Sequence, residues 1–234
     1  MRTFLFILIS VFSVAAQSPA TVTSLKDAEQ LARNGEFEAA LKELTITLQK
    51  AQLDQAESLF ISRVKYDIGA CEFRLDLTQR AIGHLEDAIR SANGYYPKAF
   101  YALGMAEASL KNWPRARTAF LTTLKADKTN GEAWFDIGVA YLGENDLEKA
   151  ETAFRNAIKY GTRDAGVGHN NIGVIRALNG EMNAAVREFE TALTLSNGDL
   201  AEARQNLNFC RTLSERTALV AKLEFGKRMG ETNE

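Results

Sequence analysis

The sequence has few cysteine, histidine and proline residues. Its 234 residues include two Cys, two His and three Pro. Because Cys71 and Cys210 stand about 140 residues apart, they lack the close spacing of a disulfide framework or a zinc site. We expect both to be small buried core residues. The low proline content and the scarcity of β-branched runs favour α-helix over β-sheet.

Neither sign of charge is in large excess. The chain has 28 Lys and Arg against 30 Asp and Glu, a formal net charge of −2. Proteins that bind nucleic acid normally carry a basic excess or patch, so this balance argues against that function. The hydrophobic content, 46%, is ordinary for a soluble globular protein and excludes a disordered or collagen-like chain.

Catalytic and cofactor-binding motifs are also missing from the sequence. No nucleophile-elbow sequence surrounds any Ser, and no Gly-x-x-x-x-Gly-Lys phosphate loop is present. His84 and His169 lie far apart, and neither has the short spacing to a cysteine that a zinc site requires. We therefore predict that the protein is not an enzyme and has no catalytic residue, cofactor, metal or small-molecule substrate.

The N-terminal residues resemble an export signal. Met1–Thr3 supplies a basic start, Phe4–Val14 is almost wholly apolar, and small residues precede a cleavage site before Gln17. The apolar run is shorter than the ~20 residues that a membrane-spanning helix needs. We expect a Sec-type signal peptide at 1–16, a short linker at 17–20, and a periplasmic or secreted protein that meets the membrane only during export. The alternative is an uncleaved anchor.

A pattern of small and apolar residues recurs along the chain. The pairs Ile68-Gly69, Leu103-Gly104, Ile137-Gly138 and Ile172-Gly173 follow one another at intervals of 35, 34 and 35 residues. An Ala stands twelve residues after each Gly, and a larger apolar residue stands four residues after that Ala. An earlier and weaker copy is separated from the second by a short insertion near Ala51–Ile61. A fixed period of this length predicts a repeat protein.

Each copy has the spacing of two helices. Four residues share one helical face: Trp134, Ile137, Gly138 and Tyr141. A second face follows: Ala150, Phe154, Ala157 and Ile158. The turn cluster 143–146 between them is long enough only for an antiparallel hairpin. Because such a hairpin has apolar surface on both sides, it must stack on its neighbours.

These residues resemble the motif of the tetratricopeptide repeat (TPR) family. The copy at 131–165 carries most of that motif, whereas Glu72, Glu107 and Arg176 replace the family's Tyr at the last position of the first helix. The resemblance implies an all-α fold, a right-handed superhelical α-solenoid of about five TPR-like helical hairpins. We place the repeats at 21–54, 62–96, 97–130, 131–165 and 166–199. We expect a C-terminal capping helix at 200–226 and a flexible tail at 227–234.

A TPR-like stack implies a concave groove lined by the first helix of each hairpin. The candidate groove residues for protein binding are Arg63, Tyr66, Phe73, Arg74, Lys98, Tyr101, Met105, Phe135, Val139, Leu142, Asn170 and Val174. Their many apolar side chains favour a protein or peptide partner. The resemblance thus implies an exported scaffold or adaptor, with a role in envelope assembly or export complexes as one possibility.

Other interpretations of the same surface remain open. The groove could be covered by the chain's own Leu219–Phe225 segment or by the insertion at Leu59–Ile61. The protein could instead self-associate through its C-terminal helix and form a homo-oligomer with a structural role. A binding surface on the convex side is a further alternative.

Overall fold

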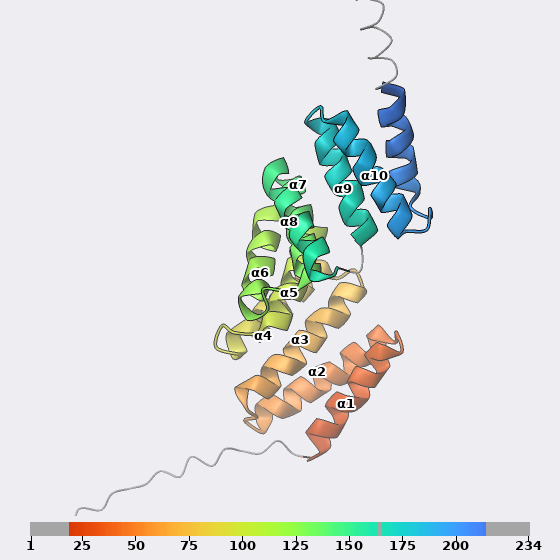
Figure 1. Ribbon diagram of the computed structural model, residues 1–234. Helices are drawn as coiled ribbons and strands as arrows, with labels where there is room; N and C mark the ends of the chain where they lie inside the picture. The colour runs from red at the N-terminus through yellow and green to blue at the C-terminus, as the bar shows by residue number, and fades with distance from the viewer. Residues whose placement is uncertain (1–18, 163–164, 214–234) are drawn as a thin grey trace, which may run out of the picture. The chain divides into compact units, whose positions relative to one another are not determined.

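The computed structural model describes residues 19–162 and 165–213, and this part of the chain is entirely helical (Figure 1). Its helices are α1 (Pro19–Arg33), α2 (Phe37–Leu53), α3 (Ser58–Arg74), α4 (Thr78–Ser91), α5 (Pro97–Ser109), α6 (Trp113–Ala126), α7 (Gly131–Gly143), α8 (Leu147–Tyr160), α9 (Ala165–Leu178) and α10 (Met182–Leu195). A further helix covers 201–213. Consecutive helices pack as hairpins, so the predicted all-α TPR-like solenoid is confirmed.

Several sequence predictions concern residues outside this part. The signal peptide at 1–16, most of the linker, and everything after residue 213, including Leu219–Phe225, lie outside the described residues. The handedness of the superhelix also stays a prediction. Within the described ranges, no helix combines the length and the hydropathy needed to cross a bilayer.

The chain divides into two compact units, 1–106 and 107–234, which we call the N-terminal and C-terminal units. In the N-terminal unit, α1 pairs with α2 and α3 pairs with α4. Seven buried residues form the core between the two hairpins: Leu25, Ala28, Ala40, Leu44, Val64, Ile68 and Cys71. The later turns of α5 pack on α4, where Ala106 is buried against Ile82 and Leu85.

The insertion near Ala51–Ile61 lengthens two helices. Both α2 and α3 have 17 residues, whereas α4 and α6 have 14 and α5 has 13. The extra residues add about one turn to the end of α2 and to the start of α3. Leu53 and Leu59 on these extensions are 83% and 68% exposed.

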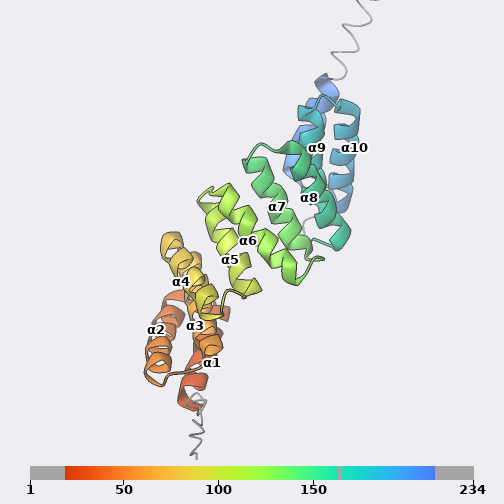
Figure 2. The ribbon, with the colours of Figure 1, turned by 90° about the vertical axis from the view of Figure 1, so that its left-hand side faces the viewer.

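In the C-terminal unit, α7 pairs with α8 and α9 pairs with α10 (Figure 2). Glycine lets each pair of helices approach closely. A Cβ atom at Gly138 would lie 2.7 Å from the Phe154 ring, and one at Gly173 would lie 2.6 Å from the Phe189 ring. Both rings are buried, so a larger residue at either position would displace core side chains.

Local capping interactions set the helix boundaries. The predicted turn at 143–146 connects α7 to α8, with Asn145 at a positive φ of 61°. The Asp146 side chain then accepts a hydrogen bond from the Lys149 backbone N–H, which caps the start of α8. Pro114 lies in the first turn of α6, where its missing N–H breaks no helical hydrogen bond.

Buried carboxylates replace the tyrosine of the TPR motif in two repeats. Glu72 is fully buried, and its oxygens lie 2.8 Å from an Arg80 nitrogen and 2.7 Å from His84 Nδ1. Glu107 is also buried and pairs with Arg115 at 2.9 Å. These partners lie on the second helix of the same hairpin. Because each buried charge has an ionic partner, the repeats tolerate the departure from the motif.

The helix at 201–213 covers the end of the last hairpin. Leu207 and Cys210 are buried in one cluster with Ala185 and Phe189 of α10. Without this helix the apolar face of α10 would be exposed, which a solenoid end must avoid. Cys71 and Cys210 are both buried free thiols.

Candidate functional site

The N-terminal unit contains a hollow of about 900 Å³, which we call the N-terminal hollow. Residues of α1, α2, α3 and the start of α5 line it: Glu29, Ala32, Arg33, Phe37, Leu44, Arg63, Tyr66, Asp67, Ala70, Cys71, Arg74, Tyr96, Pro97 and Lys98. Because α1, α3 and α5 are the first helices of their hairpins, the hollow lies on the face predicted to bind a partner. Its volume is typical of ligand-binding sites.

The wall of the hollow is apolar and aromatic. Leu44 and Cys71 are buried, and Phe37 packs against the same core cluster. The rings of Tyr66 and Tyr96 lie 5.4 Å apart, tilted by 51°. An aromatic and aliphatic wall of this kind supplies contact area for a ligand with little loss of side-chain entropy.

Four cationic side chains line the same hollow. Arg63 pairs with Glu29 of α1, with 2.5 Å between Nη2 and Oε1. The Arg74 guanidinium lies 5.1 Å from the centre of the Phe37 ring, a cation–π contact. Arg33 bonds to the neutral side chain of Gln30, at 3.0 Å. Among the described residues, neither Arg74 nor Lys98 forms an ion pair with a carboxylate.

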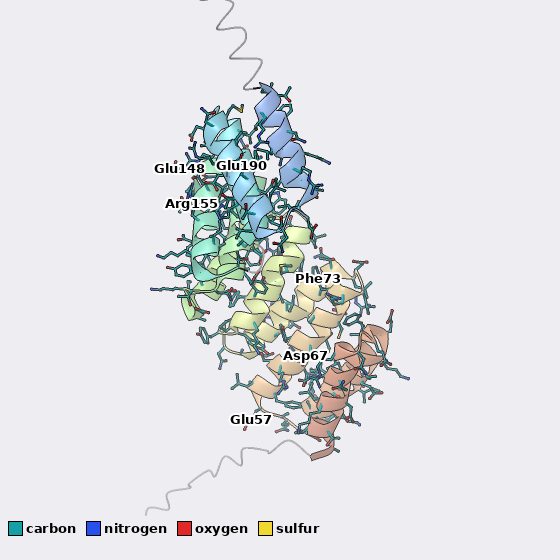
Figure 3. The ribbon with its side chains drawn as sticks, turned by 45° about the vertical axis from the view of Figure 1, so that its right-hand side comes forward. Glu57, Asp67, Phe73, Glu148, Arg155 and Glu190 are labelled. Atoms are coloured by element: carbon teal, nitrogen blue, oxygen red, sulfur yellow. The ribbon has the colours of Figure 1, made fainter. Side chains whose placement is uncertain are left out.

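A pair of carboxyl groups also lines the hollow. Asp67 lies on α3 (Figure 3), and burial raises its pKa to about 7, reinforced by the charge of Glu29 and by a side-chain hydrogen bond between the two. Arg63 and Lys98 oppose this rise. The Oδ2 atom of Asp67 is buried and accepts no hydrogen bond from the described part of the chain. Asp67 is therefore partly protonated near neutral pH.

The two phenols and the thiol of the hollow stay neutral at this pH. Burial raises the pKa of Tyr96 to about 12 and also raises that of Tyr66. Burial raises the pKa of the Cys71 thiol to about 11. The two phenols therefore remain hydrogen-bond donors, and the thiol is a poor nucleophile. Within the described ranges, no three His, Cys, Asp or Glu side chains are grouped to hold a metal ion.

Four of the predicted groove residues meet in the hollow: Arg63, Tyr66, Arg74 and Lys98. Three others of the N-terminal unit do not line it. Phe73 packs against the cluster of Ile82 and Leu85, Tyr101 is half-buried, and Met105 is 37% exposed on α5.

The predicted groove residues of the C-terminal unit contribute mainly to packing between helices. Phe135, Val139 and Leu142 pack against the core cluster that contains Phe154, and Val174 packs against the cluster of α10. Asn170 is buried, and its Oδ1 accepts a hydrogen bond from Asn206 of the last helix at 3.0 Å. A binding role for these residues stays a prediction.

Sequence reasoning missed Glu29, Phe37, Asp67 and Tyr96. A signal for Asp67 was present, because Arg63, Asp67 and Arg74 fall four and seven residues apart and share one helical face. Phe37 belongs to the first repeat, whose motif is weakest, and Tyr96 belongs to the segment between hairpins. Neither has a periodic position that would place it in the groove.

A smaller hollow of about 290 Å³ lies in the C-terminal unit. It is lined by side chains of α6, α7 and α8 that include Leu121, Trp134 and Tyr141. The Trp134 indole N–H donates to the Lys128 carbonyl at 2.9 Å, so its polar atom is already bonded. Trp134 and Tyr141 stand at motif positions of the repeat, and this hollow is a gap in the packing of motif side chains.

These hairpins define a protein of the helical-repeat class. The sequence matches the tetratricopeptide repeat family model over residues 66–131, 101–165 and 135–199, which together cover more than half of the chain. The protein therefore belongs to the TPR family, whose members are generally interaction scaffolds and not enzymes.

Solved structures share the fold at low sequence identity. MamA from Desulfovibrio magneticus RS-1 (residues 41 to the end) is 19% identical, with a TM-score of 0.69 over 80% of this chain and 100% of that one. YrrB, described as a TPR protein with an unusual peptide-binding site, is 20% identical, with a TM-score of 0.66 over 79% of this chain and 90% of that one. No curated protein sequence matches the chain.

Proposed function

We propose that this protein is an exported scaffold that binds an extended or helical segment of a protein partner in the N-terminal hollow. The observation that carries the proposal is the hollow itself, about 900 Å³, which is lined by aromatic and charged side chains. An apolar surface with a few oriented polar groups is the usual composition of a site that binds a peptide.

Two further observations support this function. Stacked helical repeats commonly bind partners along the surface that their first helices form. YrrB has a comparable fold and is described as having a peptide-binding site. At 20% identity this likeness concerns the fold, so the residues that would bind a peptide in this protein are argued from its own hollow.

The exported location rests on the N-terminal sequence. Residues 1–16 have the basic start, the apolar run and the small residues of a Sec-type signal. A scaffold released outside the cytoplasm would act on envelope or secreted partners, and a role in envelope assembly or export complexes is consistent with this. Fractionation of the host and N-terminal sequencing would test it, because a cytoplasmic chain that retains Met1 contradicts export.

A substitution that fills the hollow tests partner binding. Ala70 lines the hollow, so Ala70→Trp should place a bulky ring where the partner segment would lie. Ala39 is exposed on α2 and does not line the hollow, so Ala39→Trp is the matched control. Each chain is immobilised, incubated with the exported fraction of the host, and analysed by mass spectrometry.

The two variants distinguish the outcomes. We expect the wild type and Ala39→Trp to capture the same partner, and Ala70→Trp to lose it while its helical circular dichroism is unchanged. Equal capture by all three chains would show that binding does not use the hollow.

One exposed side chain supports a second candidate, self-association through the C-terminal helix. Phe209 is 64% exposed on the helix at 201–213. An exposed ring of this size on a terminal helix favours contact with another apolar surface. Light scattering gives the molar mass of the full chain, of Phe209→Ser and of a chain ending at residue 214. A monomeric full chain would rule out self-association.

A further inference from the structure

We infer that the N-terminal hollow binds an acidic peptide segment and takes up a proton at Asp67, the carboxyl group beside Glu29, when it does so. This inference rests on the proposed function, because it specifies the ligand and the regulation of the same hollow. It is carried by the charges that line the hollow and by the contact between the two carboxyl groups.

The first step concerns the sign of the charge. Four cations line the hollow against two carboxyl groups, and Glu29 is already paired with Arg63. Arg74 contacts an aromatic ring, and within the described residues Lys98 forms no salt bridge, although its charge acts on Asp67. These two cations can bind carboxylates of a ligand without first breaking an ion pair. Charge complementarity therefore favours an acidic segment.

The second step concerns the proton. Asp67 and Glu29 come from different helices, and both the charge of Glu29 and a side-chain hydrogen bond to it favour the protonated form of Asp67. The Oδ2 atom of Asp67 is buried without a hydrogen-bond partner in the described chain. Ionisation of Asp67 would therefore place a second negative charge beside Glu29 in a buried position, which favours the protonated form of Asp67.

The third step is to identify every charged or titratable group that faces Asp67. Helix α1 contributes Glu29 and Arg33, α3 contributes Arg63, Tyr66, Cys71 and Arg74, and the segment that leads into α5 contributes Tyr96 and Lys98. Helix α2 contributes Phe37 and Leu44, which do not titrate. Burial keeps the phenols and the thiol protonated at neutral pH, and the cations keep their charge. The group that changes its charge near pH 7 is Asp67.

The coupling follows from these charges. A carboxylate of the ligand that enters the hollow repels an ionised Asp67 and therefore favours its protonated form. By linkage, binding then takes up a proton and becomes tighter as the pH falls through 7. If the bound anion raises the pKa of Asp67 by about one unit, affinity falls about fivefold between pH 6 and pH 8, with uptake of about half a proton at pH 7.5.

The charge of the ligand is tested with a displayed library of random peptides, selected on the full immobilised chain at pH 6. We expect the selected sequences to be rich in Asp and Glu, and to lose affinity at least fivefold with Arg74→Gln and Lys98→Gln combined. Lys42→Gln, at an exposed position of α2 outside the hollow, is the control. Selection of sequences rich in Lys and Arg would overturn the inference.

The proton uptake is tested with the selected peptides. Their affinity for the wild type should fall about fivefold from pH 6 to pH 8. Asp67→Asn should remove this dependence, and Asp27→Asn, an exposed position of α1, should retain it. Titration calorimetry of the wild type, in two buffers with different ionisation enthalpies, measures the uptake directly and needs no variant. Zero uptake would overturn the inference, even if the peptides are acidic.

Failure of the proposed function gives a different result. If peptides are selected but bind equally well to Ala70→Trp, they do not occupy the hollow, and the location of the site is wrong. If they are blocked by Ala70→Trp but show no preference for acidic residues, the hollow binds peptides and only the present inference fails.

Discussion

Two glycines of the α3–α4 hairpin should respond in opposite ways to substitution by alanine. A Cβ atom at Gly69 would lie 2.8 Å from Leu85 Cγ, 3.1 Å from Leu85 Cδ2 and 3.2 Å from the Ala81 carbonyl oxygen. Leu85 is fully buried, so its side chain has little room to move. A Cβ atom at Gly83 would meet no atom within 4 Å. Both glycines lie inside helices, so they differ in contacts and not in backbone conformation.

The magnitudes follow from two opposing terms. Alanine in place of glycine inside a helix stabilises the fold by about 1 kcal/mol, and Gly83→Ala should gain roughly that amount. Gly69→Ala gains the same amount but adds an overpacking cost of about 1–3 kcal/mol. The two variants should therefore differ by about 1–3 kcal/mol in the free energy of unfolding.

Urea unfolding followed by circular dichroism measures this difference. With a denaturant slope of about 2 kcal/mol per molar, the midpoint of Gly83→Ala should lie roughly 1 M above that of Gly69→Ala. The double variant Gly69→Ala, Leu85→Ala should lose less free energy of unfolding than the sum of the two single losses, because the smaller side chain at 85 relieves the overlap with the Cβ atom at 69. Equal stabilisation by both glycine substitutions would refute the close packing of α3 on α4.

Three further predictions concern charged groups. Arg80→Ala should destabilise the chain by about 1–2 kcal/mol while Glu72 is present, because the buried carboxylate then keeps only His84 as a partner. The destabilisation should be smaller in a Glu72→Leu background, and thermal unfolding of the four chains checks this. Arg176→Ala should lower the free energy of unfolding by about 1 kcal/mol, because it removes the ion pair with Glu151 on α8. This loss should be smaller in concentrated salt, as urea unfolding at two ionic strengths would show. The pKa of Asp67 is raised by folding, so this group favours the folded state below its unfolded pKa of 3.8, and that contribution is lost as the pH rises through about 7. Asp67→Asn should therefore stabilise the chain at pH 8 by roughly 1–2 kcal/mol more than at pH 5, as urea midpoints at both pH values would show.

The fold could be predicted because its information is periodic. The spacing of Gly138, Ala150 and Phe154 is a direct consequence of two helices that cross closely and bury a ring beside the crossing. The same spacing in the neighbouring repeats predicts the same hairpin. The lengthening of α2 and α3 was not predicted, because an insertion between two helices can form a loop or extend the helices, and periodicity alone does not decide between them.

The candidate site could be predicted only in part. Arg63, Tyr66 and Arg74 were found because they occupy the exposed face of a first helix whose register the repeat establishes. Tyr96 was missed because it lies between hairpins, where no repeat position defines its direction. The raised pKa of Asp67 depends on burial and on the charge of Glu29 from another helix. A single sequence does not show how close Glu29 lies to Asp67.

The groove was predicted to extend through several repeats, but its residues differ in their surroundings. The ring centroids of Phe135 and Phe154 lie 5.4 Å apart, and the two rings meet edge to face. A first-helix position that faces the groove can therefore also pack against the second helix of its own hairpin when the side chain is large. The sequence pattern does not separate these two roles, whereas the contacts in the structure do.

The most direct test of the account is a residue-by-residue map of where a selected acidic peptide binds. Amide chemical shifts of the isotopically labelled chain are recorded with and without the peptide at pH 6. We predict that the largest changes occur at Tyr66, Asp67, Arg74 and Lys98, and that they are lost in Ala70→Trp. Changes confined to α7–α10, or changes that persist in Ala70→Trp, would contradict a binding site in the N-terminal hollow.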